Sequence, residues 1–348
     1  MGVRYSIRYF VALIPGILAL LGNCSSVYFA MANIFWVMVV QVSLDWILKP
    51  SKRKPPEFET GMLPNFILLT SSLLHIIVIF FLIRGIVKEN IEGWHIIVCA
   101  LSTGINSGLA GFIVAHELVH RKTAFERTLG QINLLAGNYL HFYIEHIHGH
   151  HRTVATTEDP ATARYGEDIY RYMARTIPYQ WWNALQTEVK RIKKEGSENP
   201  YGLSNYVIQT TILEISVLTF IGVFFGPIVF AAYVGQNLVA IFLLEYVNYI
   251  EHYGLTRNRS QKISAIHAWH TDTPASRMSL FELNRHADHH LKASKQFYTL
   301  NAHEESPVLP SGYFGMFYVA LFPKWWFRKV NPLVPKEFLP ENNGGNIS

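Results

Sequence analysis

The chain has 348 residues, of which 50% are hydrophobic and only 16% are charged, and its mean hydropathy is +0.15. Soluble proteins carry about 25% charged residues, so this composition excludes a disordered chain and argues against a soluble protein of this length. The net charge is +5, and the chain contains two cysteines but sixteen histidines. Two cysteines exclude a disulfide-rich scaffold, a Cys-ligated zinc module and a four-cysteine iron–sulfur centre. The composition therefore favours a membrane protein in which imidazole holds any metal.

Long stretches with few or no charged residues predict six membrane-spanning helices and an all-α fold. The 36 residues between Arg8 and Asp45 would form a helix about 54 Å long, whereas the hydrocarbon core of a bilayer is about 30 Å thick. They therefore predict two spans, which divide at the turn Gly22-Asn23. Two further stretches predict one span each, and a last apolar region, which divides at Gly226-Pro227, predicts two more. The predicted spans are residues 7–22, 26–47, 62–83, 94–115, 205–225 and 228–249.

The positions of lysine and arginine predict how these spans are oriented. With a cytoplasmic N-terminus, the outer connections carry Arg84 and Lys88, which leaves 28 of the 30 basic residues on the inner side. Residues 116–204 and 250–348 then form a cytoplasmic helical cap, and both termini are cytoplasmic. Residues 128–144 are uncharged but polar, and we expect them to form an interfacial or buried helix. The sequence thus predicts one domain in the inner (cytoplasmic) membrane.

Fourteen of the sixteen histidines lie in two windows, 116–151 and 252–303, both within the predicted cap or at its edge. His116 and His120 are four residues apart and share a helix face. The patterns His-x3-His-His at 146–151 and His-x2-His-His at 286–290 each bring three imidazoles to one side of a helix. A further histidine ends the sixth span. The nine candidate metal ligands are His116, His120, His146, His150, His151, His252, His286, His289 and His290.

Nine ligands are too many for one zinc ion, but they suffice for two metal ions with four or five ligands each. Imidazole binds iron, zinc, copper and nickel alike, so the spacing does not name the metal. The segment His-Glu-Leu-Val-His at 116–120 also matches the pattern of zinc metalloproteases. An intramembrane zinc protease therefore stays open as an alternative, and it predicts no role for His252 or the last cluster. A metal transporter or store is a third possibility, which predicts ligands along the spans.

At these residues the sequence resembles the integral-membrane alkane 1-monooxygenases, the AlkB-type non-haem di-iron hydroxylases. The matching segments are His-Glu-Leu-Val-His-Arg-Lys from 116, Glu-His-Ile-His-Gly-His-His-Arg-Thr-Val-Ala-Thr from 145 with Asp159-Pro-Ala, Asn-Tyr-Ile-Glu-His-Tyr-Gly-Leu from 248, and Leu-Asn-Arg-His-Ala-Asp-His-His from 283. The chain departs from the family pattern at His270, Arg277 and Asn284. The resemblance implies two iron ions held by the nine histidines, O2 as co-substrate, and terminal hydroxylation of alkanes to primary alcohols. Hydroxylation of aromatic methyl groups, as in xylene monooxygenase, or another histidine-box hydroxylase or desaturase activity, remains an alternative.

The sequence contains neither a Gly-rich dinucleotide fingerprint nor a cysteine cluster, so the electrons must come from another protein. The resemblance implies rubredoxin and a rubredoxin reductase as donors. We expect a hydrocarbon substrate that reaches the site from the bilayer, and no nucleic-acid partner.

Carboxylates close to the histidine clusters are candidates to accept ring N–H bonds and so orient the ligands. They are Glu117, Glu145, Asp159, Glu251 and Asp288. Glu214 lies near the middle of the fifth span, where an ionisable group is costly, and His75 lies at a similar depth in the third span. We expect these two residues to face the bundle interior and to pair.

Overall fold

The computed structural model describes residues 2–51, 54–56 and 60–339. Within these ranges every named element is helical, which confirms the all-α prediction; an isolated bridge joins His270 and Val308. The last part of the predicted cap, residues 340–348, lies outside the described residues.

Among the described residues, six helical stretches are long and apolar enough to cross a membrane, as predicted, and the chain is a multi-pass integral membrane protein. They are Gly2–Cys24 (α1 Gly2–Ser6, η1 Ile7–Leu13, α2 Ile14–Cys24), Val27–Ile47 (α3 Val27–Phe35, η2 Trp36–Gln41, α4 Val42–Ile47), α5 Met62–Val87, Trp94–Val119 (α6 Trp94–Asn106, η3 Ser107–Phe112, α7 Ile113–Val119), α12 Tyr206–Phe225 and α13 Pro227–His252. Large apolar side chains such as Phe80, Ile97 and Val223 are exposed on these helices. Exposed apolar surface of this kind suits contact with lipid.

Residues 128–144 do not form a seventh span among the described helices. Helix α8 (Ala124–Ala136) ends at Gly137, and Asn138 has a φ of 57°, so the chain turns sharply there. The short helix α9 (Phe142–Ile144) then leads into η4 (Glu145–His150). Residues 128–144 were predicted to form one interfacial or buried helix, and the turn instead divides them between α8 and α9.

Three wide π-helical turns interrupt the helices, namely η2, η3 and η4. A π turn closes a hydrogen bond between residues five apart, where an α-helix closes one between residues four apart, so it shifts the face on which the following side chains lie. The first two turns lie inside the second and fourth spans, and η4 carries the second histidine cluster. Such turns occur often at functional sites.

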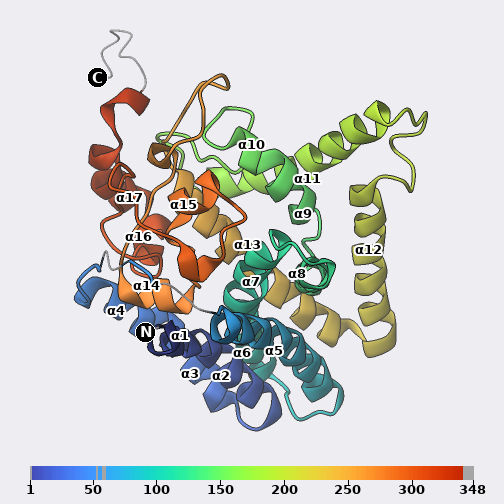
Figure 1. The fold of residues 1–348 in the computed structure, drawn as a ribbon. Coiled ribbons are helices and arrows are strands. Elements are labelled where there is room, and N and C mark those ends of the chain that lie inside the picture. Colours follow the sequence, from blue (N-terminus) through green and yellow to red (C-terminus); the bar gives the residue numbers. More distant parts are fainter. Residues whose placement is uncertain (1, 52–53, 57–59, 340–348) are drawn as a thin grey trace.

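The cap lies over one end of the apolar bundle (Figure 1). Its elements are α8, α9, η4, α10 (His151–Thr153), α11 (Ile169–Lys194), η5 (Ala265–His267), α14 (Pro274–Ser279), α15 (His286–Leu291), η6 (Phe297–Thr299), α16 (Phe317–Leu321), α17 (Pro323–Val330), η7 (Asn331–Leu333) and η8 (Lys336–Phe338). Buried aromatic residues, among them Tyr172, Tyr249 and Trp326, join α11, the end of α13 and α17 in one core. This core fixes the end of α13, where His252 lies.

Two buried carboxylates connect the first two spans to the segment before α15. Glu282 accepts hydrogen bonds from Arg277 Nε at 2.7 Å and Tyr9 OH at 2.8 Å, and it also pairs with Arg8. Asp45 of α4 accepts hydrogen bonds from Ser276 Oγ at 2.6 Å and from two backbone N–H groups at 314 and 315. The N-terminal helices are therefore bonded directly to the part of the cap that carries the last histidine cluster.

Candidate metal centre

The nine predicted histidines converge in two groups. The first group contains His116, His120, His146, His151 and His289, and the second contains His150, His252, His286 and His290. In each group, one ligand atom from every residue lies within 4.8 Å of the others. Residues far apart in the sequence thus form two neighbouring sets of five and four imidazoles.

The distances between ring nitrogens match a shared metal ion. Nε2 of His120 lies 2.9 Å from Nε2 of His146 and 3.1 Å from Nε2 of His151, and these last two atoms lie 3.1 Å apart. In the second group, Nε2 of His286 lies 2.8 Å from Nε2 of His290 and 3.2 Å from Nε2 of His252. Two nitrogens that bind one metal ion at about 2.1 Å and at a right angle lie about 3 Å apart.

Hydrogen bonds alone do not satisfy these nitrogens, because a ring nitrogen either donates or accepts and three of them face each other in a triangle. Burial, together with the neighbouring imidazoles, holds the pKa of His146, His151 and His289 well below 6.5 and lowers the pKa of His120 to about 4. The rings are therefore neutral at pH 7 and offer lone pairs. Nε2 of His116 and of His150 is buried and has no hydrogen-bond partner among the described residues. The donor set fits two metal ions that prefer nitrogen ligands.

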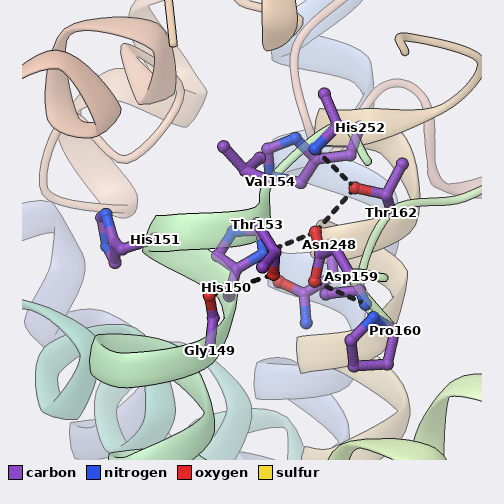
Figure 2. Close-up of polar contacts among 12 residues, drawn as sticks. Gly149, His150, His151, Thr153, Val154, Asp159, Pro160, Thr162, Asn248 and His252 are labelled. Carbon is purple, nitrogen blue, oxygen red and sulfur yellow. Dashed lines mark hydrogen bonds and ion pairs between the residues drawn. The ribbon is translucent and has the colours of Figure 1, made fainter. Parts of the chain in front are cut away.

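The π turn η4 explains how the second cluster is divided between the two groups. His146 and His151 are five residues apart, which is one π turn, and both belong to the first group. His150 belongs to the second group, and Figure 2 shows its ring and that of His151 on opposite sides of the chain. The last cluster is divided as well, since His289 joins the first group whereas His286 and His290, four apart on α15, join the second. The sequence spacing predicted three imidazoles on one side and did not show this division.

Asp159 is the carboxylate that orients a histidine in the predicted way. Its Oδ2 atom lies 3.0 Å from Nδ1 of His150 and accepts a hydrogen bond from Thr162 Oγ1 at 2.6 Å (Figure 2). Burial alone would raise the pKa of Asp159, but the contacts with His150 and Thr162 hold it below the usual value. With Nδ1 bound to Asp159, Nε2 of His150 faces the second group. Sequence reasoning missed Thr162, which lies directly after the matched segment Asp159-Pro-Ala.

The other four candidate carboxylates have different surroundings. Glu251 Oε2 lies 3.3 Å from Nε2 of His286, the nitrogen that faces the other histidines, so this carboxylate points at the metal position itself. Glu117 accepts from Arg121 at 2.8 Å and from the backbone N–H of Phe297 at 3.1 Å.

Asp288 binds Lys295 Nζ at 2.7 Å and His303 Nε2 at 2.8 Å, and Glu145 is buried beside Gly149 and Asn183. Glu117 and Asp288 therefore do not bind a candidate ligand ring; they stabilise the segments around the histidines through hydrogen bonds and ion pairs with other residues. Sequence reasoning assigned His303 no role, and only the fold brings it to Asp288.

The predicted pairing of His75 with Glu214 is wrong. The two ring nitrogens of His75 contact Asn133 Oδ1 at 2.7 Å and Ser107 Oγ at 3.1 Å, so neither is left for a carboxylate. Glu214 accepts a hydrogen bond of 2.5 Å from the backbone N–H of Leu140, in the turn between α8 and α9. Both residues face the protein interior, but each satisfies a different polar group there.

A narrow, mostly apolar channel leads from the second span to the histidines. Its lining residues come from the second, fourth and sixth spans and from the cap, and they include Met38, Leu109, Val247 and Phe314. His116 and Glu251 also line it. The free volume is about 40 Å³, room for about three water-sized groups. The channel thus runs from membrane-spanning helices to His116 of the first histidine group and to Glu251, which lies 3.3 Å from His286 of the second group.

Residues 92–320 match the fatty acid desaturase family, and the chain belongs to that family. Within it, the chain is 37% identical to alkane 1-monooxygenase 1 of Pseudomonas aeruginosa over 67% of its own length and 62% of that protein. It is 34% identical to alkane 1-monooxygenase 1 of Alcanivorax borkumensis over 88% of its length and 77% of that protein. It is 28% identical to the xylene/toluene monooxygenase hydroxylase component of Pseudomonas putida over 67% of its length and 62% of that protein. The relatives at 32–37% identity are alkane 1-monooxygenases, in agreement with the resemblance found in the histidine clusters.

Proposed function

We propose that the protein is a membrane di-iron monooxygenase that hydroxylates the terminal carbon of alkanes. One atom of O2 enters a terminal C–H bond to give a primary alcohol, and two electrons and two protons reduce the other atom to water. The observation that carries this proposal is the convergence of nine histidines in groups of five and four at the end of an apolar channel. The similarity to alkane 1-monooxygenases supports it.

The nine histidines would hold two iron ions, which would supply the activation of O2 because no side chain can activate it. Asp159 fixes the ring of His150, and the cap helices around it exclude bulk water. Glu251 places a carboxylate oxygen 3.3 Å from Nε2 of His286 and is therefore a candidate tenth ligand. The apolar channel presents the substrate end-on, so that its methyl group comes first.

We further propose that the cap faces the cytoplasm and that the protein lies in the inner membrane. The basic residues of the cap favour this orientation. Electrons would come from rubredoxin and a rubredoxin reductase, and the hydrocarbon would enter from the bilayer between the spans.

The surroundings of Glu117 argue against an intramembrane zinc protease. In that class the glutamate of His-Glu-x-x-His acts as the general base at the metal. Here the Glu117 carboxylate pairs with Arg121 and accepts a hydrogen bond from the backbone N–H of Phe297. A group of five imidazoles also exceeds the three ligands of a catalytic zinc site.

The related xylene/toluene hydroxylase component favours aromatic methyl groups as the second candidate substrate. Metal analysis and product analysis on the purified protein test the di-iron site and distinguish the two candidate substrate classes. We expect two iron ions per chain, and primary alcohols from alkanes when O2, reduced rubredoxin and rubredoxin reductase are present. One zinc per chain would contradict the di-iron site. Alcohols from toluene or xylene alone would assign the protein to the second substrate class.

A further inference from the structure

A polar cavity of about 460 Å³ lies between α11 and the turn that carries the second histidine cluster. Asn183 and Lys194 of α11 line one side, and Gly149 of η4 lines its buried end. A Cβ atom at Gly149 would lie 2.9 Å from Asn183 Nδ2, so a larger residue there would displace the Asn183 side chain. Figure 1 shows α10 and α11 on the side of the molecule away from the apolar bundle. We call this the α11 cavity.

The lining of the α11 cavity carries an excess of positive charge. The charged residues are Arg152, Lys190, Arg191, Lys194 and Arg259 against Glu158 and Glu188, five cations and two anions. Both anions are already paired, since Glu158 accepts from Arg259 Nη1 at 2.6 Å and Glu188 accepts from Arg191 Nη2 at 2.8 Å. Within the described part of the chain, the side chains of Arg152, Lys190 and Lys194 have no ion-pair or hydrogen-bond partner. All three are exposed, so they are available to an external anion.

Gly149, at the buried end of the cavity, is adjacent in the chain to members of both histidine groups. Gly149 is followed in the chain by His150, which belongs to the second group, and by His151, which belongs to the first. A route through covalent bonds therefore runs from the cavity to either metal position within two residues. An anionic lipid headgroup or free phosphate would also neutralise the cations. Neither of them gives a reason for the cavity to end at Gly149, next to His150 and His151.

We propose that the α11 cavity is the docking site of a small, acidic, soluble electron-carrier protein, and that electrons enter the metal centre through the backbone at Gly149. This inference rests on the proposed function, which requires two external electrons for each hydroxylation. A reduced one-electron carrier docks with its acidic surface on Arg152, Lys190 and Lys194, loses one electron to the metal centre and leaves oxidised. Two such dockings supply one turnover. Electrostatic complementarity of this kind raises the association rate and weakens at high salt.

Binding measurements on a charge-reversal variant test the docking site. The variant is Lys190→Glu with Lys194→Glu, and the matched control is Lys193→Glu with Lys336→Glu, which changes the net charge equally at exposed residues outside the cavity. The protein is placed in nanodiscs of neutral lipid. The probe is rubredoxin with zinc in place of iron, which binds but transfers no electrons. We expect the Kd to rise about tenfold at low ionic strength for the cavity variant only, and the difference to shrink as salt is added.

Three results would overturn the docking site: an unchanged Kd in the cavity variant, an equal rise in the control, or an effect that occurs only in nanodiscs with anionic lipid, which would identify a headgroup site. Circular dichroism and metal content establish that both variants fold. The binding measurement needs no turnover. Normal, cavity-dependent binding without alcohol formation would therefore overturn the proposed reaction and still support the docking site.

Discussion

Asp159 accepts a hydrogen bond from Nδ1 of His150, and this contact leaves Nε2 of the same ring facing the second histidine group. Removing such a carboxylate partner lowers metal affinity about 10- to 100-fold, because the ring loses its fixed tautomer and orientation. We expect Asp159→Asn to lose metal from the four-histidine group, which metal analysis after dialysis measures. Glu158→Gln is the control, since the neighbouring Glu158 is exposed and pairs with Arg259. Full metal retention in Asp159→Asn would show that Asp159 has no such role.

Glu214 accepts the backbone N–H of Leu140 inside the bundle, so it stabilises the turn that leads into the second histidine cluster. Glu214→Gln keeps an acceptor oxygen and should leave the thermal midpoint almost unchanged. Glu214→Leu leaves the buried N–H without a partner, which costs about 1–3 kcal/mol. Thermal unfolding of both variants in the same detergent separates the two cases. A lower midpoint in the glutamine variant equal to that in the leucine variant would indicate that the charge itself is required.

At the scale of elements, Glu282 connects the first span to the segment before α15. Its carboxylate contacts Arg8, Arg277 and, at 3.6 Å, Arg285, and all except Arg8 are fully buried. Removing one partner of a buried ion pair costs about 3–5 kcal/mol, because the remaining charges lose their counter-ion. We expect Glu282→Gln to lower the thermal midpoint and to release metal, since α15 supplies three of the nine histidines.

The exposed Glu305 offers a matched control, and Glu305→Gln should behave like the unchanged protein. Stability and metal content equal to the control in the Glu282 variant would show that α15 is held by other contacts.

Long apolar stretches predicted six spans, but some of the helices run further than the predicted spans. Helix α13 contains Glu245 and continues past residue 249, through Glu251, to His252. Glu245 fits inside the helix bundle because Gln180 Nε2, at 2.8 Å, and Tyr139 OH, at 3.0 Å, donate hydrogen bonds to it. These donors come from distant segments, so the sequence alone does not show how a carboxylate inside a predicted span is satisfied.

The nine histidines were identifiable from spacing, whereas their division into two groups was not. The division depends on the π turn η4, and nothing in the residues 145–150 distinguishes a π turn from an α-helix. The pairing of His75 and Glu214 failed for a similar reason. Depth along a helix can be read from the sequence, but the partner depends on which helices are neighbours, and here Asn133 of α8 lies next to His75.

For the whole molecule, the buried neutral histidines make stability depend on pH when no metal is bound. Burial lowers the pKa of His120 to about 4 and that of His141 to about 3, against 6.5 in the unfolded chain. The unfolded chain therefore binds more protons below pH 6.5, and the free energy of unfolding falls as the pH decreases from 6.5 toward 4. We expect the thermal midpoint of chelator-treated protein to be clearly lower at pH 5 than at pH 7.

The metal-loaded protein provides the comparison for this experiment. Protons must displace the metal before the ligand rings become charged, so its midpoint should begin to fall at a lower pH. Identical pH profiles with and without metal would contradict the assignment of these histidines as ligands.

The positions of the histidines along the chain determine when the metal site can be completed during synthesis. When residue 252 has been made, six of the nine imidazoles exist, but each group still lacks members from α15. Glu282, which precedes α15, bonds to Arg8 and Tyr9, which are among the first residues made. The inserted spans must therefore hold an incomplete site until the last quarter of the chain arrives. Metal capture is then a late step of biogenesis, and it coincides with the closure of the end of the chain onto its beginning.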